Sequence, residues 1–168
     1  VVELWKPIED ANMVEPFSDY LLQKHNIDRM AQGKPVFGEE VTSEMSRQAV
    51  KEYEAKYPKF KTWSADINKF FKNQLRNMTE AGLTSIETEK HLNDTYDNYV
   101  RIQREQAGVQ TPVSVVNGRI KIKSPVMKAK GGSGNILPLK ETMAQQSVAI
   151  KKAIRRNDLG LELLKELG

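Results

Sequence analysis

The chain has 168 residues and a net charge of +4, and it contains no cysteine. This length fits one domain of ordinary size, and the lack of cysteine excludes disulfides and thiolate metal sites. Apolar residues make up 39% of the chain, yet no apolar run approaches the roughly 18 residues that a membrane span needs. We therefore expect a soluble protein of a reducing compartment, with no membrane partner. Because the chain opens with neither a signal peptide nor an initiator methionine, we expect it to be a piece of a longer protein.

The charge is divided unevenly along the chain. Residues 106–168 carry eleven Lys and Arg against four acids, whereas residues 1–105 carry fifteen against eighteen. This asymmetry indicates a polyanion or an acidic partner for the C-terminal third. The alternative is that the two parts of the chain simply attract each other.

The first half of the chain predicts helices after an extended start. Residues 1–16 are interrupted by Pro7 and Pro16 and predict an extended arm anchored by Trp5. A helix should begin near Pro16 and end at Gly33. Another, capped by Thr42 or Ser43, should stop before Pro58.

The clearest amphipathic pattern runs from Pro58 to Ala81, and Gly82 should terminate it. Thr84-Ser85-Ile86-Glu87 is a capping-box pattern that predicts a further helix to about Asn93. The apolar stripe of the long helix is expected to form the core; its members are Phe60, Trp63, Ile67, Phe70, Phe71, Leu75 and Met78.

The helical pattern breaks after residue 106. Asn117-Gly118 lies between two β-rich runs, which predicts a hairpin near residues 112–123. A Gly-rich basic loop follows at 128–135. A helix should start at Leu137-Pro138, and Asn157 or Asp158 should cap a separate final helix rich in leucine.

We therefore predict a mainly α fold, a multi-helix domain with one small β-hairpin. Three parts are expected within one domain: a helical body with an extended N-terminal arm (1–106), the hairpin and basic loop (107–137), and C-terminal helices (138–168).

Basic and Gly-rich positions of the C-terminal third form the candidate anion or nucleic-acid contact. Cations gather there without an intervening acid between Ala107 and Lys140, and consecutive glycines let backbone N–H groups converge on an anion. The loop is not a Walker A sequence, and no aromatic residue in it could stack bases, so binding would be non-specific. The alternatives are a flexible linker and a solvated basic face. The candidate residues are Arg119, Lys121, Lys123, Lys128, Lys130, Gly131, Gly132, Lys151, Lys152, Arg155 and Arg156.

No catalytic, cofactor or metal constellation is predicted. His25 and His91 are the two histidines, and neither has a partner at metal-ligand spacing, so a surface or half-buried polar role is expected. The acidic pairs Glu39-Glu40 and Glu52/Glu54 are interpreted as solvated faces.

Several phrases, read in order, resemble a helical domain of the large polyvalent proteins of tailed phages and conjugative elements. The resemblance implies a phage or mobile-element context, in the bacterial cytoplasm or the virion, and a non-enzymatic module among enzymatic ones. It implies no active-site residues. The phrases are Phe17-Ser18-Asp19-Tyr20-Leu21-Leu22, His25-Asn26-Ile27-Asp28-Arg29-Met30, Gly33-Lys34-Pro35-Val36-Phe37-Gly38, Tyr57-Pro58-Lys59-Phe60, Ala81-Gly82-Leu83-Thr84-Ser85-Ile86-Glu87, Tyr96-Asp97-Asn98-Tyr99-Val100 and Lys130-Gly131-Gly132-Ser133-Gly134-Asn135-Ile136-Leu137-Pro138-Leu139.

Our leading hypothesis is thus a structural or interaction module that contacts neighbouring domains of a longer chain and, through its basic C-terminal third, nucleic acid. The alternative is an assembly module in which the hairpin or the leucine-rich tail makes a homo-oligomer. An accessory domain of an enzyme is the third hypothesis.

Overall fold

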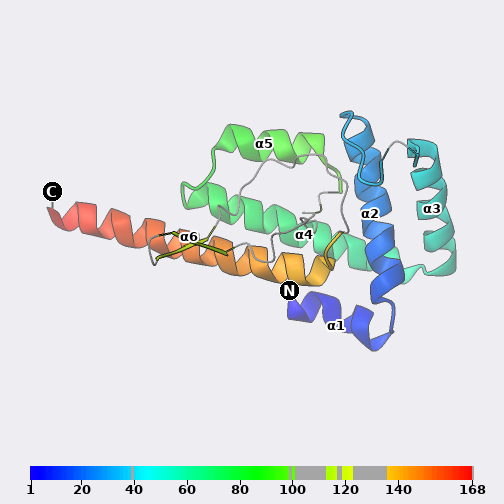
Figure 1. Cartoon of the computed structure of the whole chain (residues 1–168), viewed down its shortest axis with the longest axis horizontal. Helices are drawn as coiled ribbons and strands as arrows, with labels where there is room; N and C mark the ends of the chain where they lie inside the picture. The colour runs from blue at the N-terminus through cyan, green and yellow to red at the C-terminus, as the bar shows by residue number, and fades with distance from the viewer. Residues whose placement is uncertain (39, 99, 101–112, 117–118, 123–135, 168) are drawn as a thin grey trace.

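The computed structural model describes residues 1–38, 40–98, 100, 113–116, 119–122 and 136–167. In this part the chain is mainly helical, as predicted. Figure 1 shows α2 and α3 side by side, running across the direction of α4, α5 and α6. The helices are α1 (Val2–Asp10), α2 (Val14–Met30), α3 (Ser43–Lys56), α4 (Lys59–Glu80), α5 (Ile86–Thr95) and α6 (Leu139–Leu167).

Two short strands follow α5 in the chain. β1 (Val113–Val116) and β2 (Arg119–Ile122) pair antiparallel, with Val116 opposite Arg119. The turn at 117–118 and the segments on both sides of the pair lie outside the described residues, as do the strands' side chains. The prediction of a hairpin that forms part of this helical domain is therefore not tested by the described residues and stays a prediction.

The N-terminal segment is helical, so the predicted extended arm is wrong. α1 carries Pro7 in its interior, where a proline removes one backbone hydrogen bond and usually costs about 3 kcal/mol. Trp5 and Ile8 from the same helix are both fully buried. Burial of two large side chains, at roughly 1.5–3 kcal/mol each, offsets the cost of the proline.

Aromatic rings from α1, α2 and α4 form the centre of the core. The Phe17 ring packs edge-on against the rings of Trp5, Phe60 and Trp63, with centroid distances of 5.8, 5.2 and 5.7 Å. Edge-to-face contacts of this kind stabilise the core in addition to the stabilisation from buried apolar area. Of the expected core stripe of α4, Phe60, Ile67, Phe71 and Met78 are buried, and Trp63, Phe70 and Leu75 are partly buried.

Glycine ends two helices by the same hydrogen-bond pattern. After α2, the Gly33 N–H donates to the Met30 carbonyl (3.0 Å) and the Lys34 N–H to the Arg29 carbonyl (3.0 Å). Gly82 ends α4 in the same way, and both glycines have positive φ, +68° and +76°. This is a Schellman motif, which needs a left-handed residue at the first position past the helix cap. The predicted ends of both helices are thus confirmed.

A buried polar cluster joins α2 to α3 and to the loop between them. The fully buried Asn26 donates its amide to the Ser46 hydroxyl (2.8 Å), and its carbonyl oxygen accepts from the Val36 N–H (2.8 Å). Ser46 in turn donates to the Gln23 carbonyl oxygen (2.8 Å). These polar side chains of the cluster therefore have hydrogen-bond partners, which is the condition for such a cluster to stabilise a core.

A single helix, α6, replaces the two C-terminal helices that we predicted, so the break at Asn157 or Asp158 is wrong. Asn157 does not cap a helix: its side-chain amide donates to the Ala81 carbonyl at the end of α4. Because the Asn157 side chain is bonded to another element, it does not compete for the backbone hydrogen bonds of its own helix. Gly160 is also helical.

Candidate interaction surface on helix α6

One face of α6 is fixed to the body of the protein. Leu139, Met143 and Ile150 are buried on this inner face. The Trp5 indole N–H donates to the Met143 sulfur (3.4 Å), which joins α6 to α1. The four side chains that we call the inner face are Leu139, Met143, Ser147 and Ile150.

Further contacts fix α6 along its length. Lys140 forms an ion pair with Glu9 of α1. The Gln74 amide of α4 donates to the Ser147 hydroxyl (3.0 Å). Together with the Asn157 bond to the end of α4, these contacts set the rotation of α6 about its axis.

The opposite side of α6 is basic. Lys151, Lys152, Arg155 and Arg156 are all exposed. At about 3.6 residues per turn, these positions centre on the side of the helix opposite the inner face. Within the described part of the chain none of the four forms an ion pair. We call these four side chains the α6 basic face.

Four of the eleven predicted contact residues therefore lie on one side of a single helix. Arg119 and Lys121 belong to β2, but their side chains lie outside the description. The other candidates lie outside the described residues altogether, so their place relative to the α6 basic face stays a prediction. They are Lys123, Lys128, Lys130, Gly131 and Gly132.

The last turns of α6 extend past the ends of α4 and α5 (Figure 1). Their leucines are exposed, with exposed fractions between 52% and 84%. Because exposed apolar side chains on a soluble protein are usually scattered singly, this group makes the end of α6 a candidate contact surface. The exposed leucines are Leu159, Leu161, Leu163, Leu164 and Leu167.

Two of these leucines continue the inner face of α6, a feature that our sequence analysis missed. Ile150, Ile154, Asn157, Leu161 and Leu164 are separated by alternating steps of four and three residues. Such steps keep side chains on one face of a helix. The signal was present in the sequence, but the assumed helix break at Asn157 divided it.

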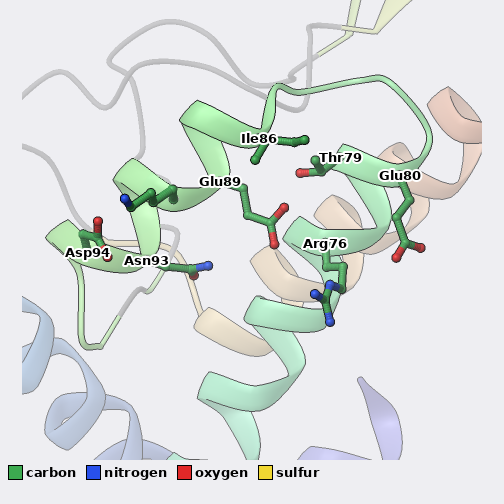
Figure 2. Close-up of a pocket in the computed structure, with 8 residues that line it drawn as sticks. Arg76, Thr79, Glu80, Ile86, Glu89, Asn93 and Asp94 are labelled. Carbon is green, nitrogen blue, oxygen red and sulfur yellow. The ribbon is translucent and has the colours of Figure 1, made fainter.

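A shallow groove lies between α4 and α5 (Figure 2). Its volume is about 580 Å³ and it is open to solvent. Figure 2 shows Arg76 of α4 and Glu89 of α5 directed into the gap, with Ile86 at its end beside Thr79. The remaining lining residues include both acids and a lysine. This mixed charge favours neither an anion nor a cation.

His25 is buried rather than at the surface. It is 3% exposed, its Nδ1 lies 2.9 Å from the Asn98 carbonyl oxygen, and its ring packs against the Tyr96 ring at 5.6 Å. Burial lowers the pKa of His25 to about 4, against the Asn98 hydrogen bond, which raises it; nearby Arg29 lowers it further. The imidazole is therefore neutral at physiological pH and joins α2 to the segment after α5. His91, by contrast, is exposed.

Among the described residues, no group of three or more His, Cys, Asp and Glu side chains is placed to hold a metal ion. None of the described helices is both long and apolar enough to cross a membrane. Comparison of the chain with protein-family models, with curated proteins and with solved structures gives no match.

Proposed function

We propose that this chain is a non-catalytic interaction module that binds nucleic acid non-specifically through the α6 basic face. One observation carries the proposal: Lys151, Lys152, Arg155 and Arg156 are exposed, without an ion pair in the described part, on the side of α6 opposite its inner face. Cations without internal partners are available to phosphates, and their release of counterions drives binding.

The predicted hairpin would enlarge this surface. In the sequence, Arg119 and Lys121 alternate with isoleucines, a pattern that in a strand is expected to place both cations on one face. The phage or mobile-element context is part of the same proposal. It is supported by the resemblance to the polyvalent proteins, whose chains are thought to accompany injected DNA.

Binding of labelled duplex and single-stranded DNA, measured by fluorescence anisotropy over a series of salt concentrations, tests the proposal. The variant K151Q/K152Q/R155Q/R156Q should bind more weakly than the wild type. Its slope of log affinity against log salt should be shallower by about 3–4 for duplex DNA, since each lost phosphate contact removes about 0.9.

A matched control removes four exposed cations elsewhere. Lys34, Lys51, Lys59 and Lys90 are exposed, form no ion pair within the described residues and are spread over other elements. The variant K34Q/K51Q/K59Q/K90Q has the same net charge as the test variant and should retain most of the affinity. Equal affinities of the two variants, or no binding by the wild type at low salt, would remove the proposal.

A separate variant addresses the predicted hairpin and loop. Neutralising Lys121, Lys123, Lys128 and Lys130 together should weaken binding further if these residues add to the surface. An unchanged affinity would restrict the contact to α6.

A second candidate function is assembly, and the exposed leucines at the end of α6 favour it. An apolar surface on a helix is usually covered by another helix. Light scattering over a range of protein concentrations distinguishes a self-associating chain from a strict monomer. A strict monomer would contradict this function without affecting the nucleic-acid proposal.

A further inference from the structure

We propose that the end of α6, residues 158–167, binds the same segment of a second copy of this chain in antiparallel orientation. The proposal rests on the assembly role named above and specifies its partner, its contact residues and its geometry. It depends on the packing of α6, on the exposed leucines and on the placement of charge beside them.

The packing face of α6 extends beyond the helix that covers it. α4 ends at Glu80, and Asn157 contacts the carbonyl of Ala81 just after that end. Leu161 and Leu164 follow Asn157 at steps of four and three residues and are 52% and 67% exposed. They occupy the positions that a neighbouring helix would cover if α4 were longer.

Leu161 and Leu164 form a strip along α6 that we call the α6 seam. The charges beside this seam favour a second copy of the chain as its partner. Asp158 and Lys165 are exposed and lie seven residues apart, so they flank Leu161 and Leu164 on the same side of the helix. In an antiparallel pair, equivalent flanks face each other. Asp158 of one copy then lies near Lys165 of the other, and the two-fold symmetry makes this pair twice.

A parallel pair lacks this complementarity. In a parallel pair, the flank with Asp158 and Lys165 faces the other flank of the partner. That other flank carries Gly160 and Leu167, which are uncharged.

The shape of the molecule leaves room for this arrangement. Figure 1 shows the end of α6 projecting beyond α4 and α5, with no described element beside its last turns. Two copies that overlap only through these ends keep their bodies at opposite ends of the pair. Because the overlap is short, the area buried is small, and we expect a weak dimer in the micromolar range or above.

Light scattering and sedimentation of the full chain, from about 5 to 500 µM, test the dimer. The variant L161E/L164E should weaken dimerisation at least about a hundredfold, because it places like charges in the seam. The control L159E/L163E changes two leucines of similar exposure, 61% and 54%, on the other side of the helix and should dimerise within about threefold of the wild type. Circular dichroism checks that both variants remain helical.

A charge exchange tests the orientation. The single variant D158K places two lysines opposite each other at both ends of the overlap and should weaken the dimer roughly tenfold. The double variant D158K/K165D restores opposite charges and should recover the affinity of the wild type. A parallel pair would respond to neither change.

The outcomes separate the two levels of the proposal. If the wild type is monomeric throughout the range, both the assembly role and this dimer are wrong. If the wild type self-associates but L161E/L164E does so equally, assembly stands and the α6 seam is wrong. If L161E/L164E is monomeric but D158K/K165D fails to recover the affinity lost in D158K, the antiparallel orientation is wrong.

Discussion

Protonation of His25 should destabilise the fold at mildly acidic pH. The group is neutral in the folded state because burial lowers its pKa to about 4, whereas the unfolded chain protonates near the ordinary value of 6.5. Between these values the unfolded state binds more protons, so the free energy of unfolding falls as pH decreases. The full effect is about 3 kcal/mol, of which about 2 kcal/mol should be lost between pH 7 and pH 5.

Urea unfolding of the wild type at pH 7 and pH 5, compared with His25→Gln, measures this contribution. The variant lacks the titrating group, so its stability should fall by about 2 kcal/mol less over the same interval. The pKa of Asp28, which burial raises, gives a change of opposite sign in acid, and both proteins share it. His91→Gln is the matched control and should follow the wild type, because His91 is exposed. If the stability of His25→Gln falls as much as that of the wild type, the conclusion that the buried imidazole is neutral is wrong.

Four substitutions test the packing and the helix ends by denaturant unfolding. Trp5→Ala should cost about 3–5 kcal/mol, because the side chain is fully buried; a loss below about 1 kcal/mol would place α1 outside the core. Asn26→Ala should cost about 2–3 kcal/mol by leaving the buried Val36 N–H without its acceptor, and a neutral result would contradict the polar cluster. Gly82→Ala should cost about 1–2 kcal/mol, because its φ is +76°. Gly160→Ala, in the helical interior of α6 with open space around it, should instead stabilise by up to about 1 kcal/mol; effects of the same sign would refute the argument from φ.

The helices that the sequence predicted correctly are those whose signals are local. α4 has a long amphipathic stripe and a glycine at its end, and both act within a few residues. The Thr42 hydroxyl accepts from the Met45 N–H at the start of α3, as its cap position predicts. Ser85 does the same for α5 with the Thr88 N–H. The N-cap of α5 is therefore Ser85, the second residue of the expected capping-box pattern, and not Thr84, its first residue.

The two wrong predictions depend on distant residues. A proline inside a short N-terminal segment argues against a helix until Trp5 is known to contact Phe17 and Met143. Asn157 resembles a cap until its partner, the Ala81 carbonyl, is known. Both contacts join residues far apart in the chain, and periodicity or capping rules read only near neighbours. The burial of His25 follows in the same way from Asn98, which comes from another segment.

The two proposed roles of α6 use adjacent stretches of one helix, and this has a consequence for how they combine. The α6 basic face ends at Arg156, and the seam begins at Leu161. An antiparallel overlap of Leu161 with Leu164 of a second copy sets the two Arg156 positions, the nearest ends of the two basic faces, about 20 Å apart along the helix axis, at about 1.5 Å per residue.

The α6 basic face lies opposite the inner face, which Leu161 and Leu164 continue, so the two basic faces of the pair point away from each other. One straight duplex therefore contacts only one of them. L161E/L164E and L159E/L163E leave every cation in place and carry the same charge, so they should bind a long duplex with equal affinity. Weaker binding by L161E/L164E would mean that dimerisation brings both basic faces onto one duplex, which would contradict the proposed geometry.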